Sequence, residues 1–195
     1  MSKAAQTRAF IIEKTAAVFN KKGYAGTSLT DLTEATGLTK GALYGNFKSK
    51  DEIAVAAFEY NVQKVSYVFP DDGKQTVIDR LLAIPAHYKK RFVTVAECGG
   101  CPVLNTAVEA DDNQPELKEK VNEVIKAWKS QYVQILQEGI DKGEIKPGIN
   151  PASYAHLFIA LFEGGTMLSK VTGDLGYFND AMNRMTQIIK SELPL

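Results

Sequence analysis

The sequence predicts an all-α protein of about nine helices, and three observations support this fold class. Apolar residues recur at helical spacing, as at Ile12, Ala16 and Phe19. No segment shows the persuasive period-2 alternation of a half-buried strand. Glycines and prolines also divide the 195 residues into segments of helical length. A hydrophobic content of 45% and a charged content of 24% suit one globular domain or two small ones.

Glycine and proline set most of the expected helix boundaries. Gly23, Gly37 and Gly143 end helices, whereas a proline suits the first turn of the helix that it opens. Pro85 is expected to kink or interrupt its helix because it lacks an N–H donor. The expected helices are 4–22, 29–36, 40–47, 50–69 (closed by Pro70 and Asp71-Asp72-Gly73), 75–91, one from Pro102, 115–142, 151–171 and 175–193.

Residues 27–47 have the pattern of a helix-turn-helix. Leu29, Leu32 and Leu38 are placed to bury the first helix and the turn, and Leu43 and Phe47 are placed to bury the second helix. Gly37 supplies the backbone freedom that a tight turn between two helices needs. Thr27 or Ser28 is expected to cap the first helix, and Thr39 the second.

The second helix of such a unit enters the major groove with its N-terminus leading. Small, polar or basic residues are therefore needed there, and Lys40, Gly41 and Ala42 fit. Lysines and Tyr44 further along suit phosphates, which give affinity and register rather than specificity. The candidate DNA-binding residues are Thr27, Ser28, Thr39, Lys40, Gly41, Ala42, Tyr44, Asn46, Lys48 and Lys50.

The charge distribution favours a nucleic-acid partner for the N-terminal segment only. Residues 1–50 hold eight Lys or Arg residues and three acids, an excess of five positive charges. Because the chain is neutral overall, the remaining residues carry an excess of five negative charges. A basic N-terminal unit on an acidic body agrees with DNA binding at one end.

Residues 8–53 resemble the DNA-binding domain of the TetR/AcrR family of bacterial repressors. The resemblance rests on Gly23-Tyr24, on the segment Thr27 to Ala35, on Gly37 to Gly41, and on Leu43-Tyr44 with Phe47 and Lys50-Asp51-Glu52. Two positions depart from the family pattern. Thr33 places a hydroxyl where alanine is usual, and Gly45-Asn46 replaces a bulkier pair, which leaves open whether Asn46 contacts DNA.

This resemblance implies a DNA-binding domain over residues 1–49 and a ligand-binding and dimerisation domain over residues 50–195. It also implies a homodimer on a palindromic operator of double-stranded DNA, released by an unknown small-molecule effector. The helix 50–69 would link the two domains and transmit the signal. The apolar faces of the last two helices, around Phe158 and Met185, would pair with their symmetry mates.

Aromatic and apolar residues of the middle helices are candidates for the effector pocket. Such residues also build ordinary cores, so each could serve either purpose. The candidates are Phe58, Val65, Tyr88, Phe92, Trp128, Tyr132 and Phe162.

Cys98-Gly99-Gly100-Cys101-Pro102 is a second local signal. A thiol at a helix N-terminus has a lowered pKa, so Cys101 could sense oxidants or electrophiles with Cys98 resolving the product. Two idle thiols beside a glycine turn are the simpler interpretation. A thiol oxidoreductase using Cys98 and Cys101 is the alternative function, and a helical module that binds another acidic partner is a third.

The remaining features of the sequence argue against other classes of protein. Two cysteines are too few for a disulfide scaffold, and neither a signal peptide nor a membrane span is evident. We therefore expect a cytoplasmic protein. We expect no catalytic triad, no cofactor and no metal, because two cysteines with distant histidines do not make a four-ligand zinc site.

Overall fold

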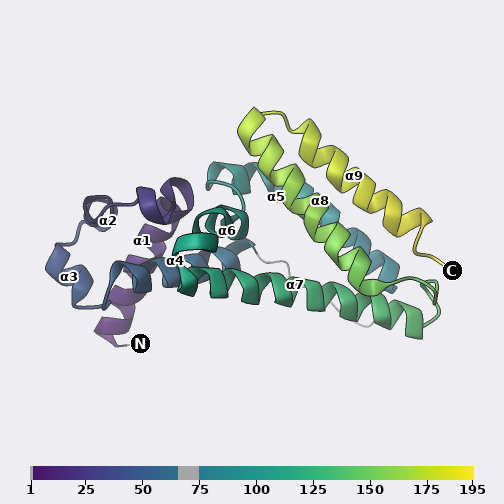
Figure 1. Ribbon diagram of the computed structural model, residues 1–195, viewed down its shortest axis with the longest axis horizontal. Coiled ribbons are helices and arrows are strands. Elements are labelled where there is room, and N and C mark those ends of the chain that lie inside the picture. The colour runs from purple at the N-terminus through teal and green to yellow at the C-terminus, as the bar shows by residue number, and fades with distance from the viewer. Residues whose placement is uncertain (1, 66–74) are drawn as a thin grey trace. The chain divides into compact units, whose positions relative to one another are not determined.

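The computed structural model describes residues 2–65 and 75–195. Within these ranges the chain is all-α, with nine helices and no strand, which confirms the predicted fold class (Figure 1). The helices are α1 (Lys3–Gly26), α2 (Leu29–Thr36), α3 (Lys40–Tyr44), α4 (Lys50–Val65), α5 (Val77–Glu97), α6 (Pro102–Asn113), α7 (Pro115–Asp141), α8 (Pro151–Thr172) and α9 (Gly176–Ser191). The predicted end of the fourth helix, at Phe69 and Pro70, lies outside the described residues.

Helix ends near the N-terminus agree closely with the expected ones. The second helix has the predicted range, Leu29–Thr36, and ends at Gly37 with φ 68°. Gly23 leaves the helical conformation as expected, with φ 72° and ψ 174°, but one further turn follows it up to Gly26. The third helix ends at Tyr44 rather than at residue 47, with Gly45 as its C-cap.

Pro85 does not interrupt its helix. Helix α5 continues through Pro85 from Val77 to Glu97, and the proline itself is buried. Neighbouring apolar residues, Leu81 and Ile84, are almost fully buried on the same helix. Burial of this apolar face offsets the hydrogen bond that proline cannot donate, so the expected interruption is wrong.

The chain divides into two compact units. The first comprises residues 1–66 and 97–123, and the second comprises residues 67–96 and 124–195. The first unit therefore contains α1 to α4, α6 and the start of α7. The predicted boundary after residue 49 concerns the DNA-binding segment and stays a prediction.

In the first unit, α1 packs against α4, α2 and α6. Ile11, Phe19 and Ile53 are buried where α1 meets α4. Each such side chain contributes about 1.5–3 kcal/mol when it is buried. This packing stabilises the helices that support the helix-turn-helix.

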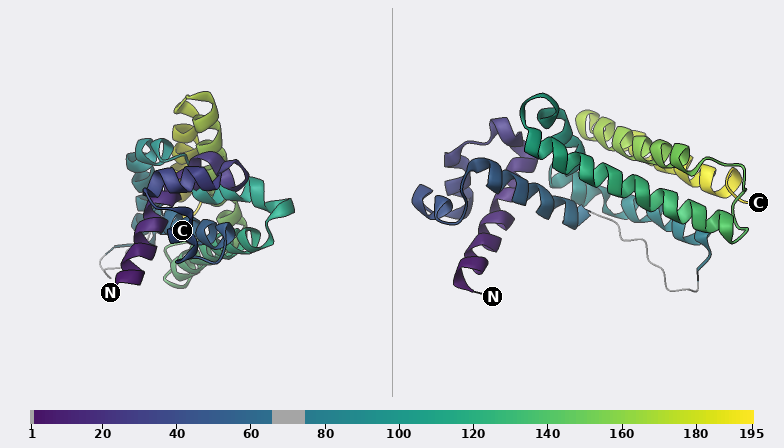
Figure 2. Two further views of the ribbon diagram at one scale, coloured as in Figure 1. Left: turned by 90° about the vertical axis from the view of Figure 1, so that its left-hand side faces the viewer. Right: turned by 60° about the horizontal axis from the view of Figure 1, so that its bottom comes forward.

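In the second unit, α5, most of α7, α8 and α9 lie along one another as a bundle (Figure 2). Its core draws on all four helices, with Leu81, Leu136, Phe158 and Ile188 each fully buried. Figure 1 shows α8 and α9 as antiparallel neighbours, joined by a short turn at Gly173.

The apolar faces of α8 and α9 expected to form a dimer interface are instead buried inside the unit. Phe158 and Met185, which define those faces, are at most 1% exposed. That assignment is therefore wrong, because the two faces pack into their own bundle. Other apolar residues on and between the two helices are exposed: Leu157, Met167, Leu168, Val171, Leu175 and Tyr177. No helix in the described ranges is both long and apolar enough to cross a membrane.

Candidate functional site

Helix α2 begins with a reciprocal pair of hydrogen bonds. The Ser28 hydroxyl accepts the N–H of Asp31 at 3.2 Å, and the Asp31 carboxylate accepts the N–H of Ser28 at 2.8 Å. Lys22 of α1 also donates to this carboxylate. Its ammonium, followed by the two Ser28 groups, lowers the pKa of Asp31 to about 2. Asp31 thereby fixes the start of α2 against α1.

The turn between α2 and α3 is closed by local hydrogen bonds. The N–H of Gly37 donates to the Thr33 carbonyl at 2.8 Å, and the hydroxyl of Thr39 accepts the N–H of Ala42 at 3.2 Å. Leu32 and Leu43 are fully buried beneath the turn. The two short helices are therefore held in the arrangement that the sequence predicts.

The outer face of α3 is polar and exposed. Lys40 and Gly41 are exposed, and Tyr44 keeps 40% of its surface in solvent although it is aromatic. The Lys40 ammonium lies 6.0 Å from the centre of the Tyr44 ring. A Cβ on Gly41 would have only the Thr39 hydroxyl at 4.0 Å, so this face is open to a close backbone approach.

Several predicted DNA contacts are engaged within the protein. Thr27 is 1% exposed, and its hydroxyl donates to the Gly23 carbonyl. The Asn46 amide donates to the Ala42 carbonyl at 2.9 Å. Lys50 donates to the Tyr24 carbonyl at 2.7 Å and lies over the Tyr24 ring.

The other predicted contacts are accessible. Ser28, which precedes α2, and Lys48, which follows α3, are both exposed. The two departures from the family pattern are accommodated as well. The Thr33 hydroxyl donates to the Thr30 carbonyl, so it is not left unpaired near the core.

Arg8 is a structural residue that the sequence analysis did not single out. Its guanidinium donates to the Asn46 carbonyl at 2.6 Å and to the Glu52 carboxylate at 2.7 Å. It also lies 3.9 Å from the centre of the Phe47 ring. The N–H of Lys48, followed by Arg8, lowers the pKa of Glu52. Only the charge of Arg8 was visible in the sequence, since its partners are about forty residues away.

An aromatic pocket lies in the second unit. It encloses about 390 Å³ of space, part of it open to solvent. Tyr88 and Phe162 have ring centres 4.4 Å apart, and Trp128 meets Phe162 edge-on at 6.5 Å. The lining residues are Ile84, Tyr88, Trp128, Gln131, Tyr132, Ile159 and Phe162.

Four of the seven pocket candidates thus line one pocket, namely Tyr88, Trp128, Tyr132 and Phe162. The other three do not line it. Phe92 is stacked on Phe178 at 4.0 Å in the core, and Phe58 and Val65 belong to the first unit. Gln131 was missed because a single polar residue on a long helix gives no signal in the sequence.

The two cysteines are not joined by a disulfide and lie in different environments. Cys98 is exposed, whereas Cys101 is 2% exposed at the N-cap of α6. The loop between them is fastened to α1, because the Asn20 amide donates to the carbonyls of Cys98 and Gly100. The accessible thiol is therefore the one that was expected to resolve rather than to react first. A redox role for the pair stays a prediction. The described residues contain no cluster of three metal-ligating side chains.

Comparison with known proteins gives a consistent result over the whole chain. Residues 11–57 match the family described as bacterial regulatory proteins, tetR family. Residues 77–185 match the family described as tetracyclin repressor-like, C-terminal domain.

Two solved structures are similar over nearly their full length. A TetR-family transcriptional regulator from Cytophaga hutchinsonii is 41% identical with a TM-score of 0.91, and the match covers 100% of this chain and 98% of that one. A TetR transcriptional regulator from Chloroflexus aurantiacus is 37% identical with a TM-score of 0.90, covering 100% of both. The HTH-type transcriptional repressor DhaR of Mycobacterium sp. strain GP1 is 23% identical over 167 residues, 84% of this chain and 82% of that protein.

Proposed function

Because the chain belongs to the TetR family of bacterial regulatory proteins and is a DNA-binding transcriptional regulator, we propose that it represses genes from a palindromic operator and leaves it when a small molecule binds. The observation that carries the proposal is the exposed face of α3. Lys40, Gly41 and Tyr44 face solvent there on a helix whose other side is anchored by fully buried Leu43. A regulator of transcription acts beside the DNA, so we place it in the cytoplasm.

In the proposed complex, α3 enters the major groove with Thr39 leading. Gly41 and Ala42 allow close approach, and Ala42 can touch a thymine methyl. Lys40 contacts a guanine edge or a phosphate, and Tyr44 and Lys48 contact phosphates. Ser28 can contact a phosphate at the start of α2 through its exposed hydroxyl. Thr27 only positions the fold, because its buried hydroxyl donates to the Gly23 carbonyl and its N–H donates to the Tyr24 carbonyl. The Lys50 and Asn46 side chains stabilise the fold through hydrogen bonds within the protein. They contact DNA only where DNA displaces those hydrogen-bond partners.

We further propose a homodimer formed through the second unit. Exposed apolar residues on α8 and in the turn to α9, including Met167, Leu168 and Val171, supply a surface that a second copy would cover. In the dimer the two copies of α3 would lie about 34–36 Å apart, which fits successive major grooves of a palindrome.

The aromatic pocket is the proposed effector site. Its walls are rings and aliphatic groups, and the only lining side chains able to form hydrogen bonds are Gln131, Trp128 and two tyrosines, none of which carries a charge. This chemistry favours a largely apolar, uncharged effector. To release DNA, the effector must bind the DNA-incompetent state more tightly than the DNA-bound state.

The test is a salt titration of binding to a library of genomic fragments. The wild type is compared with the double variant Lys40→Ala/Tyr44→Ala, and Lys126→Ala of α7 serves as a control for the loss of one exposed positive charge. We expect the wild type and the control to select palindromic fragments. The double variant should bind them at least about tenfold more weakly, with a shallower salt dependence.

Weak, sequence-blind binding that is identical in all three proteins would contradict the proposal. The fragments selected by the wild type also supply an operator for effector screening. An effector that fails to weaken operator binding would contradict the proposed release, but not the DNA-binding role.

A further inference from the structure

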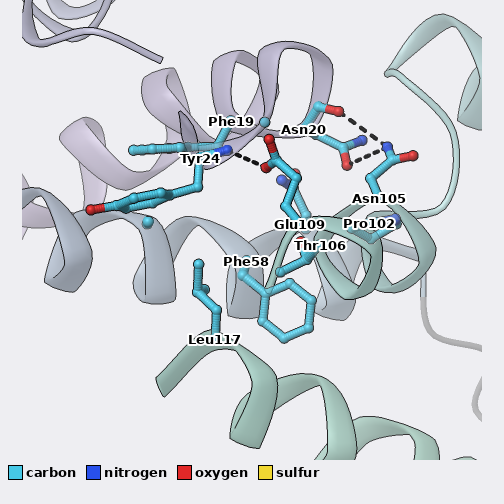
Figure 3. Close-up of a pocket in the computed structure, with 12 residues that line it drawn as sticks. Phe19, Asn20, Tyr24, Phe58, Pro102, Asn105, Thr106, Glu109 and Leu117 are labelled. Atoms are coloured by element: carbon cyan, nitrogen blue, oxygen red, sulfur yellow. Dashed lines mark hydrogen bonds between the residues drawn. The ribbon is translucent and has the colours of Figure 1, made fainter. Parts of the chain in front are cut away.

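A second pocket lies within the first unit, at the C-terminal end of α1 (Figure 3). It encloses about 410 Å³ of space, part of it open to solvent. Phe19, Phe58 and Leu117 supply apolar walls from α1, α4 and α7. Figure 3 shows the Glu109 side chain of α6 pointing toward Tyr24 of α1. The pocket is therefore amphiphilic, unlike the aromatic pocket of the second unit.

The charge of this pocket is unbalanced. Glu109 is the single ionisable acid among the residues that line it, and no Lys, Arg or His lines it. One carboxylate oxygen of Glu109 accepts the N–H of Tyr24 at 2.5 Å. A carboxylate in a partly apolar site favours a cationic ligand. The cation loses hydration free energy when it enters the site, and a charge-assisted hydrogen bond to the carboxylate offsets that loss.

The polar side chains beside Glu109 are arranged to leave it as the main acceptor. The Asn105 amide donates to the Gly99 carbonyl at 2.7 Å and to the Asn20 side chain at 3.0 Å. The Asn61 amide donates to the Ala16 carbonyl at 2.8 Å. These N–H groups are directed to protein acceptors, so the pocket favours a ligand that brings its own donors.

We propose that this pocket binds a small amphiphilic amine. Its ammonium group sits on the Glu109 carboxylate, and its apolar body lies between Phe19, Phe58 and Leu117. A ligand of this class differs in charge from the uncharged effector proposed for the aromatic pocket. The protein thus has two ligand sites with different chemical preferences.

The position of Glu109 links this site to the start of the helix-turn-helix. A Cβ on Gly23 would lie 2.3 Å from the Glu109 carboxylate, so a side chain here would have to push the carboxylate aside. The N–H that Glu109 accepts belongs to Tyr24, the first residue after the break in α1. Lys50 and Asp51 of α4 hold the same tyrosine.

Three residues separate Tyr24 from Ser28, which caps α2. An ammonium that draws Glu109 away from Tyr24 would loosen the connection that precedes α2. This effect on DNA rests on the proposed function, whereas amine binding does not. If the amine weakens DNA binding, DNA must weaken amine binding by the same factor.

The test uses the full-length protein without DNA and two probes of similar shape, benzylamine and benzyl alcohol. Binding is measured by calorimetry and by backbone amide shifts. We expect benzylamine to bind at least about tenfold more tightly than benzyl alcohol, because both probes can donate to the carboxylate but only the ammonium also neutralises its charge. Amides 19–24 and 105–109 should shift. E109Q should remove the preference, and E116Q, which removes an exposed acid of α7 outside the pocket, should keep it.

Equal binding of the two probes, or an equal loss in E109Q and E116Q, would overturn the proposal. Amide shifts confined to residues around Trp128 would also overturn it. If E109Q does not fold, the shifts in the wild type decide by themselves. Failure of the DNA-binding proposal would leave all of these outcomes unchanged, because no step of this test contains DNA.

Discussion

The recognition segment, residues 27–47, and the core of the second unit are stabilised in different ways. In the recognition segment, the helix caps and the turn are fixed by partners no more than four residues away, as between Ser28 and Asp31 or between Gly37 and Thr33. In the second unit, residues far apart in the chain meet. Phe92 of α5 stacks on Phe178 of α9, and the N–H of Val77 donates to the Glu144 carboxylate at 2.6 Å.

This difference is what the proposed function needs, in which one chain binds DNA and also responds to an effector. Local caps and a glycine in the left-handed (αL) conformation give the recognition segment a defined shape. The side chains on its outer face are therefore not needed to stabilise the fold. The second unit holds its shape through packing, so a ligand that wedges between its helices must disturb many contacts at once. Changes in the two regions should therefore affect different measurements.

Phe158→Ala should have the largest effect on stability. Phe158 is fully buried beside Tyr132 and Tyr154, so its removal leaves a cavity and should lower the free energy of unfolding by about 3–5 kcal/mol. Urea denaturation measures this loss. Phe10→Ala is the control, because Phe10 is 39% exposed and should cost under about 1 kcal/mol. Similar losses in the two variants would contradict the packing of the second unit.

Gly41→Ala should separate DNA affinity from stability. The added Cβ has open space in the free protein and a better helix propensity, so stability should stay equal or rise by about 0.5–1 kcal/mol. In the groove the same methyl would hold the backbone away from DNA, and operator affinity should fall roughly tenfold. Fluorescence anisotropy on a selected operator measures the fall. Gly148→Ala, also with nothing within 4 Å of the new Cβ, is the control and should bind as the wild type does. Unchanged affinity in Gly41→Ala would show that α3 does not approach DNA closely.

Asp31→Asn should give the smallest effect, a loss of stability above about pH 4 that disappears as the pH falls toward 2. The pKa of Asp31 is lowered in the folded protein from 3.8 to about 2, so its contribution to stability is present above about pH 4 and is lost as the pH falls toward 2. The variant should therefore lose less stability than the wild type between pH 4 and pH 2. Urea midpoints at pH 4, 3 and 2 measure this. Glu34→Gln, an exposed acid on the same helix, should retain the acid response of the wild type. An unchanged response in Asp31→Asn would mean that the Lys22 and Ser28 contacts do not form in solution.

How well each element could be predicted from the sequence depends on the same difference between local contacts and contacts between distant residues. The range of α2 and the break at Gly23 were predictable because caps and glycines act on their own neighbours. Four pocket candidates line one pocket because aromatic side chains at helical spacing face inward together. The dimer faces could not be predicted, since periodicity shows that a face is apolar but not what covers it. The prediction of an interruption at Pro85 was wrong for a related reason, because the burial of neighbouring residues stabilises α5.

The sequence by itself determined the all-α class, the helix-turn-helix and the family, because these depend on local caps, glycine turns and a spacing of a few residues. Tertiary structure alone decided that Arg8 joins the ends of α3 and α4, that Cys101 is buried and Cys98 exposed, and that Glu109 lies against Gly23. Each of these depends on contacts between helices that are distant along the chain. The energy of such contacts exists only once the helices have packed, so no local pattern in the sequence records it.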